Sequence, residues 1–409
     1  MTLRQNTVDV VIIGGGIGGL SNAVALGRDG YSVRVLERAP QFGEVGAGLQ
    51  LAPNCTRILA DWELLDEVIA LGVTPAAMIM RDGIDGAELT RLDLADVRRR
   101  YGFPYVVTHR SDLHATLLRE AKRLGVDLVT DCRVTSVTQT GAGASAISQG
   151  RIDSGSIVLA ADGLKSTVRP MLSDDQPVSS AYVAYRGAVP IEAVDDATVS
   201  LDAVVVYVGP KCHFVQYPLR QGEMFNQVAV FESPRAVAGQ ADWGTPDELD
   251  AAFSLTCRQV RSGLAHMWRD RWWRMYDRDP IGDWVRGRVA LTGDAAHPPL
   301  QYLAQGAVMA MEDAWVLAGH ARRGRSPGRP VDWDAALAAY NAVRPLHCAR
   351  VLTTARAWGD LWHRVGDERL HRNQLLRERD IHDYSFIDWL YGPTATEPAG
   401  LPPMFTPRW

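Results

Sequence analysis

The chain of 409 residues has few cysteines and no surplus of positive charge. Its five cysteines are scattered without a CxxC pair, which argues against a zinc site or a disulfide framework. A formal net charge of −5 gives no strong positive field to attract nucleic acid or an anionic membrane. The sequence therefore predicts a protein of the reducing cytoplasm, with buried thiols, no metal site and no nucleic-acid partner.

Long apolar runs are also scarce, and one segment alone imitates a signal peptide or membrane helix. It covers residues 8–26 and is interrupted at its centre by five glycines. Glycine is a poor helix former, so a buried strand followed by a Gly-rich turn and a helix explains these residues better. We expect no transmembrane segment, and the length of the chain suggests two or three packed units.

The N-terminal residues have the pattern of a dinucleotide-binding βαβ unit. A predicted strand over 8–13 leads into the Gly-rich turn and a helix, and a second predicted strand over 32–37 follows. In this motif the glycines allow a tight turn, close approach to a pyrophosphate and close packing of helix and strand. Glu37 ends the second strand, where a carboxylate can bind both ribose hydroxyls. The three glycines at the required spacing are Gly14, Gly16 and Gly19.

Later segments favour FAD over NAD as the bound dinucleotide. Arg110 precedes a predicted helix and offers a forked cation to phosphate or to the hydroxyls of the flavin chain. Asp162 follows a predicted strand, and Asp294 ends another, where it could bind a ribityl hydroxyl. Gly306 begins a helix whose dipole would stabilise reduced flavin. Alone, Arg110 would more often form a surface ion pair and Asp162 a plain Asp-Gly turn.

Together these motifs resemble those of the single-component flavoprotein aromatic hydroxylases, which include p-hydroxybenzoate and salicylate hydroxylases. The resemblance rests on the glycine motif with Glu37 and on residues 161–169 and 291–299, and it covers nearly the whole chain up to about residue 392. One departure is that the proline of the last motif comes as Pro298-Pro299, directly after the histidine. The resemblance is closest to the 3-hydroxybenzoate 6-hydroxylases, on the segments Phe42–Gln50, Thr108–Leu117, Cys212–Arg220 and His297–Ala304.

The resemblance implies an α/β fold of three parts. A Rossmann-like FAD-binding domain of the p-hydroxybenzoate hydroxylase type would comprise 1–175 and 280–325, with some insertion of the substrate domain near 75–105. A mixed β-sheet domain that binds substrate would occupy 176–279, where alternating apolar residues suggest antiparallel strands. A C-terminal helical region with a Pro-rich tail would occupy 326–409.

The resemblance also implies how the cofactors bind. No second GxGxxG motif follows a strand, so NADH (or NADPH) would dock transiently and reduce a non-covalent FAD. The family is typically cytoplasmic and often dimeric, so the expected partners are a small aromatic acid, NAD(P)H and O2, within a homodimer. The residues expected at the FAD are Gly14, Gly16, Gly19, Glu37, Arg38, Val45, Arg110, Val134, Asp162, Asp294, Gly306 and Ala307.

Hydroxylation of a phenolic ring requires a group that removes or polarises the phenol proton. His213, on a predicted strand of the middle domain, suits this role because histidine titrates near neutral pH, although a strand histidine can be structural. Gln301 and Tyr217 are the other candidate catalytic residues, with a loop contact and a core aromatic as their alternatives. Arg186 could pair with a substrate carboxylate or with a neighbouring acid, and the sequence does not decide.

The predicted activity is an FAD-dependent monooxygenase that uses NAD(P)H and O2 through a flavin C4a-hydroperoxide. The best-defined candidate reaction converts 3-hydroxybenzoate to 2,5-dihydroxybenzoate (gentisate). Salicylate, anthranilate or larger aromatic acids are alternative substrates, and a flavin dehydrogenase or oxidase, or a flavin-binding sensor, is a rival function. His297 is expected to shape the flavin loop, and Trp358 and Trp362 share a helix face that should pack against the body.

Overall fold

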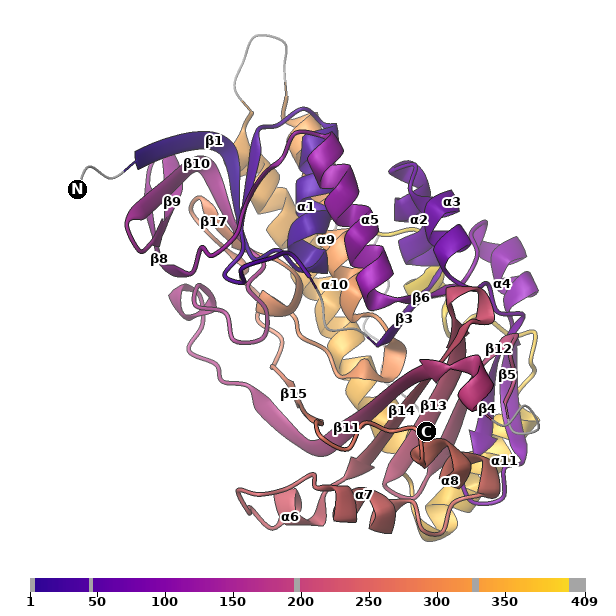
Figure 1. The fold of residues 1–409 in the computed structure, drawn as a ribbon. Coiled ribbons are helices and arrows are strands. Elements are labelled where there is room, and N and C mark those ends of the chain that lie inside the picture. The colour runs from indigo at the N-terminus through magenta and orange to yellow at the C-terminus, as the bar shows by residue number, and fades with distance from the viewer. Residues whose placement is uncertain (1–3, 44–46, 195–198, 326–330, 397–409) are drawn as a thin grey trace.

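An eight-stranded sheet, parallel at its centre, is built mainly from the N-terminal part of the chain (Figure 1). The structure is a computed structural model and describes residues 4–43, 47–194, 199–325 and 331–396. In spatial order the strands of this sheet are β16 (Val285–Arg286), β17 (Val289–Leu291), β10 (Arg151–Ala160), β1 (Arg4–Ile13), β2 (Val33–Leu36) and β7 (Asp127–Val129), while β9 (Gly143–Ser148) pairs with β10 and β8 (Val134–Thr140) with β9. The pairings from β17 to β7 are parallel. The loops after β17, β10 and β1 therefore leave the sheet at one common edge, where open α/β sheets bind ligands.

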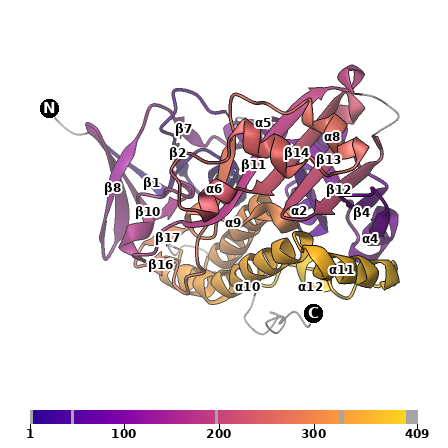
Figure 2. The ribbon, with the colours of Figure 1, turned by 90° about the horizontal axis from the view of Figure 1, so that it is seen from below.

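Long helices cover this sheet and link it to the rest of the chain. They are α1 (Ile17–Arg28), α5 (Arg110–Arg123), α9 (Gly306–Arg323), α10 (Trp333–Trp362) and α11 (Gly366–Glu378). α1 contacts both α5 and α9, and Figure 1 shows the three side by side next to the sheet. α10 packs on α9 and runs on to α11 along one side of the molecule (Figure 2). The predicted βαβ unit is thus confirmed as β1, α1 and β2.

The second sheet has seven strands and supplies the other wall of the site. In spatial order they are β15 (Trp273–Asp277), β11 (Val178–Pro190), β14 (Met224–Glu232), β13 (Cys212–Leu219), β12 (Ala203–Gly209), β4 (Ala77–Asp82) and β5 (Glu88–Asp93). β12 and β4 are parallel and the other neighbours antiparallel. Alternate residues such as Tyr185, Phe214 and Phe231 form a separate apolar core under α7 (Pro246–Ala252) and α8 (Arg258–Leu264). The opposite face is therefore left for the cavity described below.

Short elements complete the described chain. They are β3 (Gly48–Leu51) paired with β6 (Val106–His109), the helices α2 (Pro53–Asp61), α3 (Leu65–Leu71), α4 (Leu94–Tyr101), α6 (Pro234–Val237) and α12 (Asp388–Tyr391), and the 3-10 turns η1 (Arg169–Met171), η2 (Ile191–Ala193), η4 (Arg220–Gly222), η5 (Gly293–Ala295) and η6 (Gln301–Leu303). Among the described residues, no helix is both long and apolar enough to cross a membrane.

The assignment of the strands to two main sheets supports the division of the chain that the sequence suggested, and we propose that division here. The FAD-binding part would comprise 1–175 and 280–325, and the substrate-binding sheet 176–279 with the insertion near 75–105, which contributes β4 and β5. The C-terminal part would be 326–409, whose end, beyond residue 396, lies outside the described residues.

Candidate active site

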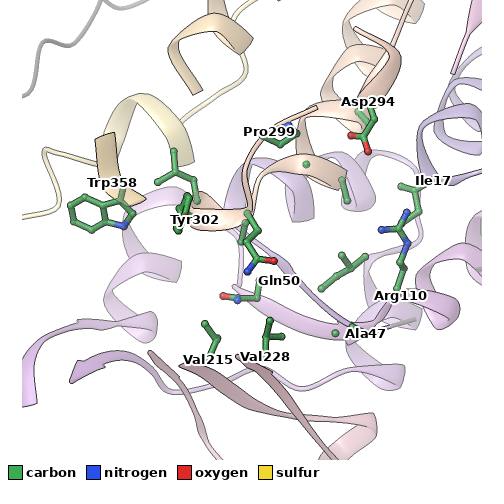
Figure 3. Close-up of a pocket in the computed structure, with 18 of the residues that line it drawn as sticks. Ile17, Ala47, Gln50, Arg110, Val215, Val228, Asp294, Pro299, Tyr302 and Trp358 are labelled. Carbon is green, nitrogen blue, oxygen red and sulfur yellow. The ribbon is translucent and has the colours of Figure 1, made fainter. Parts of the chain in front are cut away.

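A cavity of about 1350 Å³ extends from the carboxyl edge of the first sheet to the open face of the second (Figure 3). Its first end is lined by the turn after β1, the end of β2, the residue that follows β10 and the loop after β17. Its other end is lined by side chains of β11, β12, β13 and β14 and by residues of η6, α10 and α11. The volume exceeds that of a typical small-ligand pocket, which leaves room for a dinucleotide together with a small substrate.

The turn after β1 has a shape that only glycine allows. Gly14 has a φ of +104°, and a Cβ there would lie 2.4 Å from the carbonyl oxygen of Ala161. A Cβ on Gly19 would lie 1.9 Å from the carbonyl oxygen of Gly14. Gly14 and Gly16 line the cavity, whereas Gly19 lies behind it and lets α1 pack closely on β1. No side chain caps α1 and no acidic residue occupies its first turn, so its N–H groups are suited to a pyrophosphate.

Glu37, at the end of β2, lines the cavity and also holds the glycine turn. Its carboxylate accepts hydrogen bonds from the backbone N–H groups of Gly15 at 2.7 Å and Ala39 at 2.8 Å. Arg38 and Val134, also expected at the cofactor, line the same end of the cavity. The expected residue Val45 lies outside the described residues.

Asp294 lies in the 3-10 turn η5 directly after β17 and lines the cavity. Asp313 of α9 holds this turn, since its carboxylate accepts from Gly293 N at 2.9 Å and from His297 Nε2 at 2.5 Å. Burial disfavours charge on either partner, but the Asp313 carboxylate raises the pKa of His297 well above its usual value. His297 and Arg344, whose Nε lies 2.8 Å from Asp313, in turn hold the pKa of Asp313 below its usual range. His297 therefore helps to hold the loop after β17, which is the structural role that we expected for it.

Two further cofactor candidates lie at helix starts. Arg110 is the first residue of α5, and Figure 3 shows Arg110 and Asp294 projecting into the same part of the cavity. Gly306 and Ala307 begin α9, which has no side-chain cap either. Three features fit the phosphates, hydroxyls and ring edge of FAD. They are the glycine cradle, the two uncapped helix N-termini, and the side chains of Arg110 and Asp294.

Asp162 lines the cavity but is already engaged within its own turn. Its carboxylate accepts hydrogen bonds from Thr167, from the backbone N–H at 2.7 Å and from the hydroxyl at 3.1 Å. The sequence left open whether Asp162 stabilises a turn or binds the cofactor. In the structure its carboxylate stabilises the turn, and the residue also lines the cavity.

The open face of the second sheet presents a row of apolar residues that ends in one arginine. Arg186 on β11 pairs across the sheet with Val228 on β14, which pairs with Val215 on β13. All three line the cavity, and Figure 3 shows the two valines on its floor below Gln50. His213 lies two residues from Val215, so it points to the same face.

His213 is buried among aromatic rings. Its ring centroid lies 5.5 Å from that of Tyr302 and 5.0 Å from that of Trp362, and its Nδ1 lies 2.8 Å from Nε2 of His363. Burial lowers the pKa of His213 to about 3, so the imidazole is neutral at physiological pH. A neutral histidine in the wall of the cavity can accept or polarise a proton there.

Gln301 and Tyr217 lie near Arg186 in the wall of the same cavity. Nη2 of Arg186 lies 3.5 Å from Oε1 of Gln301, and its guanidinium lies 5.6 Å from the Trp273 ring centre. Burial lowers the pKa of Arg186, and its proximity to Tyr217 offsets part of this lowering. A Cβ on Gly48 would lie 2.4 Å from the Tyr217 ring, so this glycine allows β3 to approach the tyrosine closely. The structure thus places all three candidate catalytic residues in one cavity, with Gln301 beside Arg186.

Sequence reasoning missed several residues of the substrate end. Trp358 and Trp362 were expected to pack against the body, but both line the cavity, with their rings 6.3 Å apart. Their spacing of four residues correctly indicated that the two side chains lie on one face of the helix. It could not show that this face borders a cavity. Tyr302 follows the candidate Gln301, and no pattern in the sequence marks His363 as a partner of His213.

Comparison with known proteins identifies the family. Residues 7–323 match the family model described as "FAD binding domain". The chain is 38% identical to the 3-hydroxybenzoate 6-hydroxylase of Polaromonas naphthalenivorans (strain CJ2), over 95% of this chain and 98% of that protein. It is 36% identical to the 3-amino-4-hydroxybenzoate 2-monooxygenase of Streptomyces cremeus, over 97% and 96%.

The fold is also similar to solved structures. Klebsiella pneumoniae HpxO, complexed with FAD and uric acid, has a TM-score of 0.83 at 28% identity, covering 96% of this chain and 98% of that one. A salicylate hydroxylase in its substrate complex has a TM-score of 0.75 at 24% identity, covering 94% and 95%, and shows the fold alone. The family model and these relatives agree with the glycine cradle and the uncapped helix starts of the site. The chain therefore belongs to the FAD-binding-domain family and is an FAD-dependent aromatic monooxygenase.

Proposed function

We propose that the enzyme hydroxylates 3-hydroxybenzoate para to its hydroxyl group and releases 2,5-dihydroxybenzoate. One oxygen atom of O2 would enter the ring and the other would leave as water, with NADH as the electron donor. Relatives named 3-hydroxybenzoate 6-hydroxylase, at 36–38% identity over most of the chain, support this choice of substrate.

The observation that carries the proposal is the distribution of polar groups on the open face of the second sheet. Arg186 and His213 both line the cavity; the apolar Val228 lies on β14, the strand between theirs, and Val215 lies two residues from His213 on β13. They are two strands and one two-residue step apart, so roughly 12 Å separates their Cα atoms by standard sheet spacings. Both side chains extend into the cavity from the same face, so a benzoate ring can lie between them. The face therefore suits a flat aromatic acid with a carboxylate at one side and a phenol at the other.

The residues of the chain divide the work of this reaction. Bound FAD would supply the activation of O2, at the end lined by Asp294 and Gly306. His213 would accept the phenol proton at Nε2, because its Nδ1 already faces His363. Arg186 would hold the substrate carboxylate, with Gln301 and Tyr217 beside it, and Tyr302 with its aromatic neighbours would exclude water from the ring.

Product analysis tests the proposal. Purified enzyme with FAD and NADH would be supplied with 3-hydroxybenzoate under labelled O2, and we expect 2,5-dihydroxybenzoate that carries one labelled oxygen. Benzoate lacks the phenol and 3-hydroxybenzyl alcohol lacks the carboxylate, so both serve as matched controls and should give little product. Unlabelled product, or none from 3-hydroxybenzoate, would overturn the assignment. Faster turnover of salicylate, anthranilate or 3-amino-4-hydroxybenzoate would move it to that acid.

The remaining features are proposals of the same kind. We expect NADH to be preferred to NADPH, and initial rates at equal concentrations decide this; a preference of about tenfold for NADPH would contradict it. We also propose a cytoplasmic homodimer, for which light scattering of the purified FAD-bound enzyme should give twice the mass of the chain. A monomer under those conditions would contradict that part.

A further inference from the structure

A second buried histidine lies directly behind the candidate base. His363 follows α10 as its C-terminal cap, and its Nε2 lies 2.8 Å from Nδ1 of His213. The two rings are nearly parallel, with an interplanar angle of 22°. On its other side, Tyr182 of β11 stacks on the His363 ring with a centroid distance of 4.5 Å. His363 is held by its backbone too, since its carbonyl oxygen accepts from the N–H of Lys211.

The contact between the two rings can hold only one proton when both are neutral. One of the facing nitrogens must then donate and the other accept. If Nδ1 of His213 carries the proton, its Nε2 is a free base toward the cavity. If Nε2 of His363 carries it, His213 must carry its own proton on Nε2 and acts there as a donor. The state of His363 therefore determines whether His213 can take a proton from a ligand in the cavity.

The surroundings keep this pair neutral. Burial lowers the pKa of both histidines, and the cation of Arg372 on α11 lowers that of His363 further. The other titratable groups against the rings are Tyr182 on β11 and Tyr302 on η6, and burial raises the pKa of both, so both are neutral phenols. Asp360 on α10 acts on these two tyrosines, and among the described residues no carboxylate lies within ion-pair distance of either histidine. A lasting imidazolium is therefore disfavoured at this place.

We propose that His363 is a positioning residue that exchanges a proton with His213 during deprotonation of the substrate. The phenol O–H bond breaks as a proton binds His213 Nε2, the Nδ1–H bond of His213 breaks, and an Nε2–H bond forms on His363. His363 then releases its own Nδ1 proton to water, so both rings end neutral with their tautomers exchanged. The sequence reverses when the ring regains its phenol proton. This inference rests on the proposed function only in naming a phenol as the proton source.

Two variants separate proton exchange from mere structural support. In His363→Gln, the amide oxygen can still accept from His213 Nδ1–H and hold the ring, but it cannot take up the proton. In His363→Phe, the ring volume stays while both functions are lost. The probe is 3-hydroxy-6-nitrobenzoate, which has a nitro group at the position proposed for hydroxylation and a coloured phenolate. It is mixed rapidly with the FAD-bound enzyme at a pH below the pKa of its own phenol, where the free probe is still protonated, and phenolate formation is followed by absorbance.

We expect phenolate formation to slow by roughly tenfold or more in both variants, the lower range for loss of an acid–base group, with probe affinity in His363→Gln changed by less than about threefold. Wild-type rates in His363→Gln would overturn the proposal, because that variant keeps only the supporting contact. A slow His363→Phe beside a wild-type-like His363→Gln would likewise show a structural role.

A substrate-free measurement keeps this test apart from the substrate assignment. Nitrogen NMR of ¹⁵N-histidine-labelled wild type should show two neutral rings that share one proton between His213 Nδ1 and His363 Nε2. His363→Phe should remove that shared-proton signal. Two independent rings in the wild type would overturn the proton exchange whatever the substrate is. If the probe and all hydroxybenzoates fail to bind while the shared proton is present, the proposed substrate fails and the paired histidines stand.

Discussion

His297 and Asp313 form a buried ion pair, 2.5 Å from Nε2 to Oδ2, beneath the turn that carries Asp294 in the wall of the cavity. The same carboxylate accepts from Gly293 N and pairs with Arg344, so one acid holds both the loop and the helix next to it. Breaking a buried pair leaves an uncompensated charge, which costs more than the loss of a surface pair. The geometry of the cavity wall that we propose to hold FAD thus depends on a residue of α9 that does not line the cavity.

The first prediction concerns this acid. Asp313→Asn keeps the shape of the side chain but leaves His297 without its anion and Arg344 with Glu312 as its remaining carboxylate partner. We expect a loss of about 3–5 kcal/mol in the free energy of unfolding and weaker retention of FAD. Chemical denaturation and the flavin content of the purified protein measure the two effects. Asp334→Asn removes an exposed partner of Arg288 and should change neither; an Asp313→Asn enzyme of wild-type stability would contradict the role of the pair.

The pair also predicts a dependence of stability on pH. The folded pKa of His297 is raised, so its contribution is complete below the unfolded value of about 6.5 and is lost as pH rises toward the folded value. The stability difference between wild type and His297→Gln should therefore shrink above about pH 6.5. Melting temperatures of both proteins across neutral and alkaline pH provide the test. A difference that grows with pH would mean that the histidine is neutral in the folded protein.

A second prediction tests the glycine cradle. A Cβ on Gly19 would lie 1.9 Å from the backbone oxygen of Gly14, so Gly19→Ala must push α1 away from β1. We expect loss of most bound FAD and a clear fall in melting temperature. Gly27→Ala is the matched control on the same helix, because its Cβ would meet only side-chain atoms at 3.4 Å or more. If Gly19→Ala purified with full flavin, the close packing of α1 would not matter for binding.

A third prediction concerns His213. His213→Ala should slow hydroxylation by about 10²–10⁴, the usual range for an acid–base group, and should leave FAD content unchanged. NADH oxidation would fall much less, so hydrogen peroxide should accumulate in place of product. The ratio of product to NADH consumed measures this, with exposed His382→Ala as the control. Unchanged coupling would return His213 to a structural role.

The depressed pKa of His213 adds a pH test of the same residue. Because the pKa lies near 3, the neutral base persists at every pH above that value. We expect kcat/KM to stay nearly flat between about pH 8 and pH 5, without an inflection near the usual histidine value. An acid limb near pH 6.5 that vanishes in His213→Ala would show that the ring is far better solvated than its burial indicates.

The cofactor end could be predicted from the sequence because its motif is local. The strand, the glycines and Glu37 lie within 30 residues, and the close approach of Gly19 to Gly14 is contained in that short segment, whereas the contact of Gly14 with Ala161 is not. On β13, the two-residue period of a strand likewise places His213 and Tyr217 on one face. Arg110 and Asp294 lie far along the chain, and their positions before a predicted helix and at the end of a predicted strand singled them out before the family resemblance supported the choice.

The partners of the substrate end could not be predicted, because they meet only in the tertiary structure. His213 and His363 are 150 residues apart, and Arg186 and Gln301 are 115 apart. Their contacts depend on how α10 and η6 cross the second sheet, and no local periodicity carries that information. The same holds for Trp362: the sequence correctly predicted the helix face on which it lies, but not that this face lines the cavity.

The last prediction decides the choice that the sequence left open for Arg186. The guanidinium is held by a cation–π contact with Trp273 and a long contact to Gln301, and among the described residues no carboxylate lies within ion-pair distance of it. Burial without a charged partner lowers its pKa, and a substrate carboxylate would supply the missing anion.

Arg186→Met keeps much of the length of the side chain and removes its charge. We expect KM for 3-hydroxybenzoate to rise by roughly 10²-fold, as for loss of a charge-assisted bond worth about 1.5–3 kcal/mol, with flavin content unchanged. Arg186→Lys should recover part of the affinity, since an ammonium keeps the charge but not the forked geometry. The decisive comparison uses 3-hydroxybenzyl alcohol, whose slow turnover should hardly change in Arg186→Met because it has no carboxylate to lose. An equal loss for both compounds would show that Arg186 supports the sheet face and does not recognise the acid.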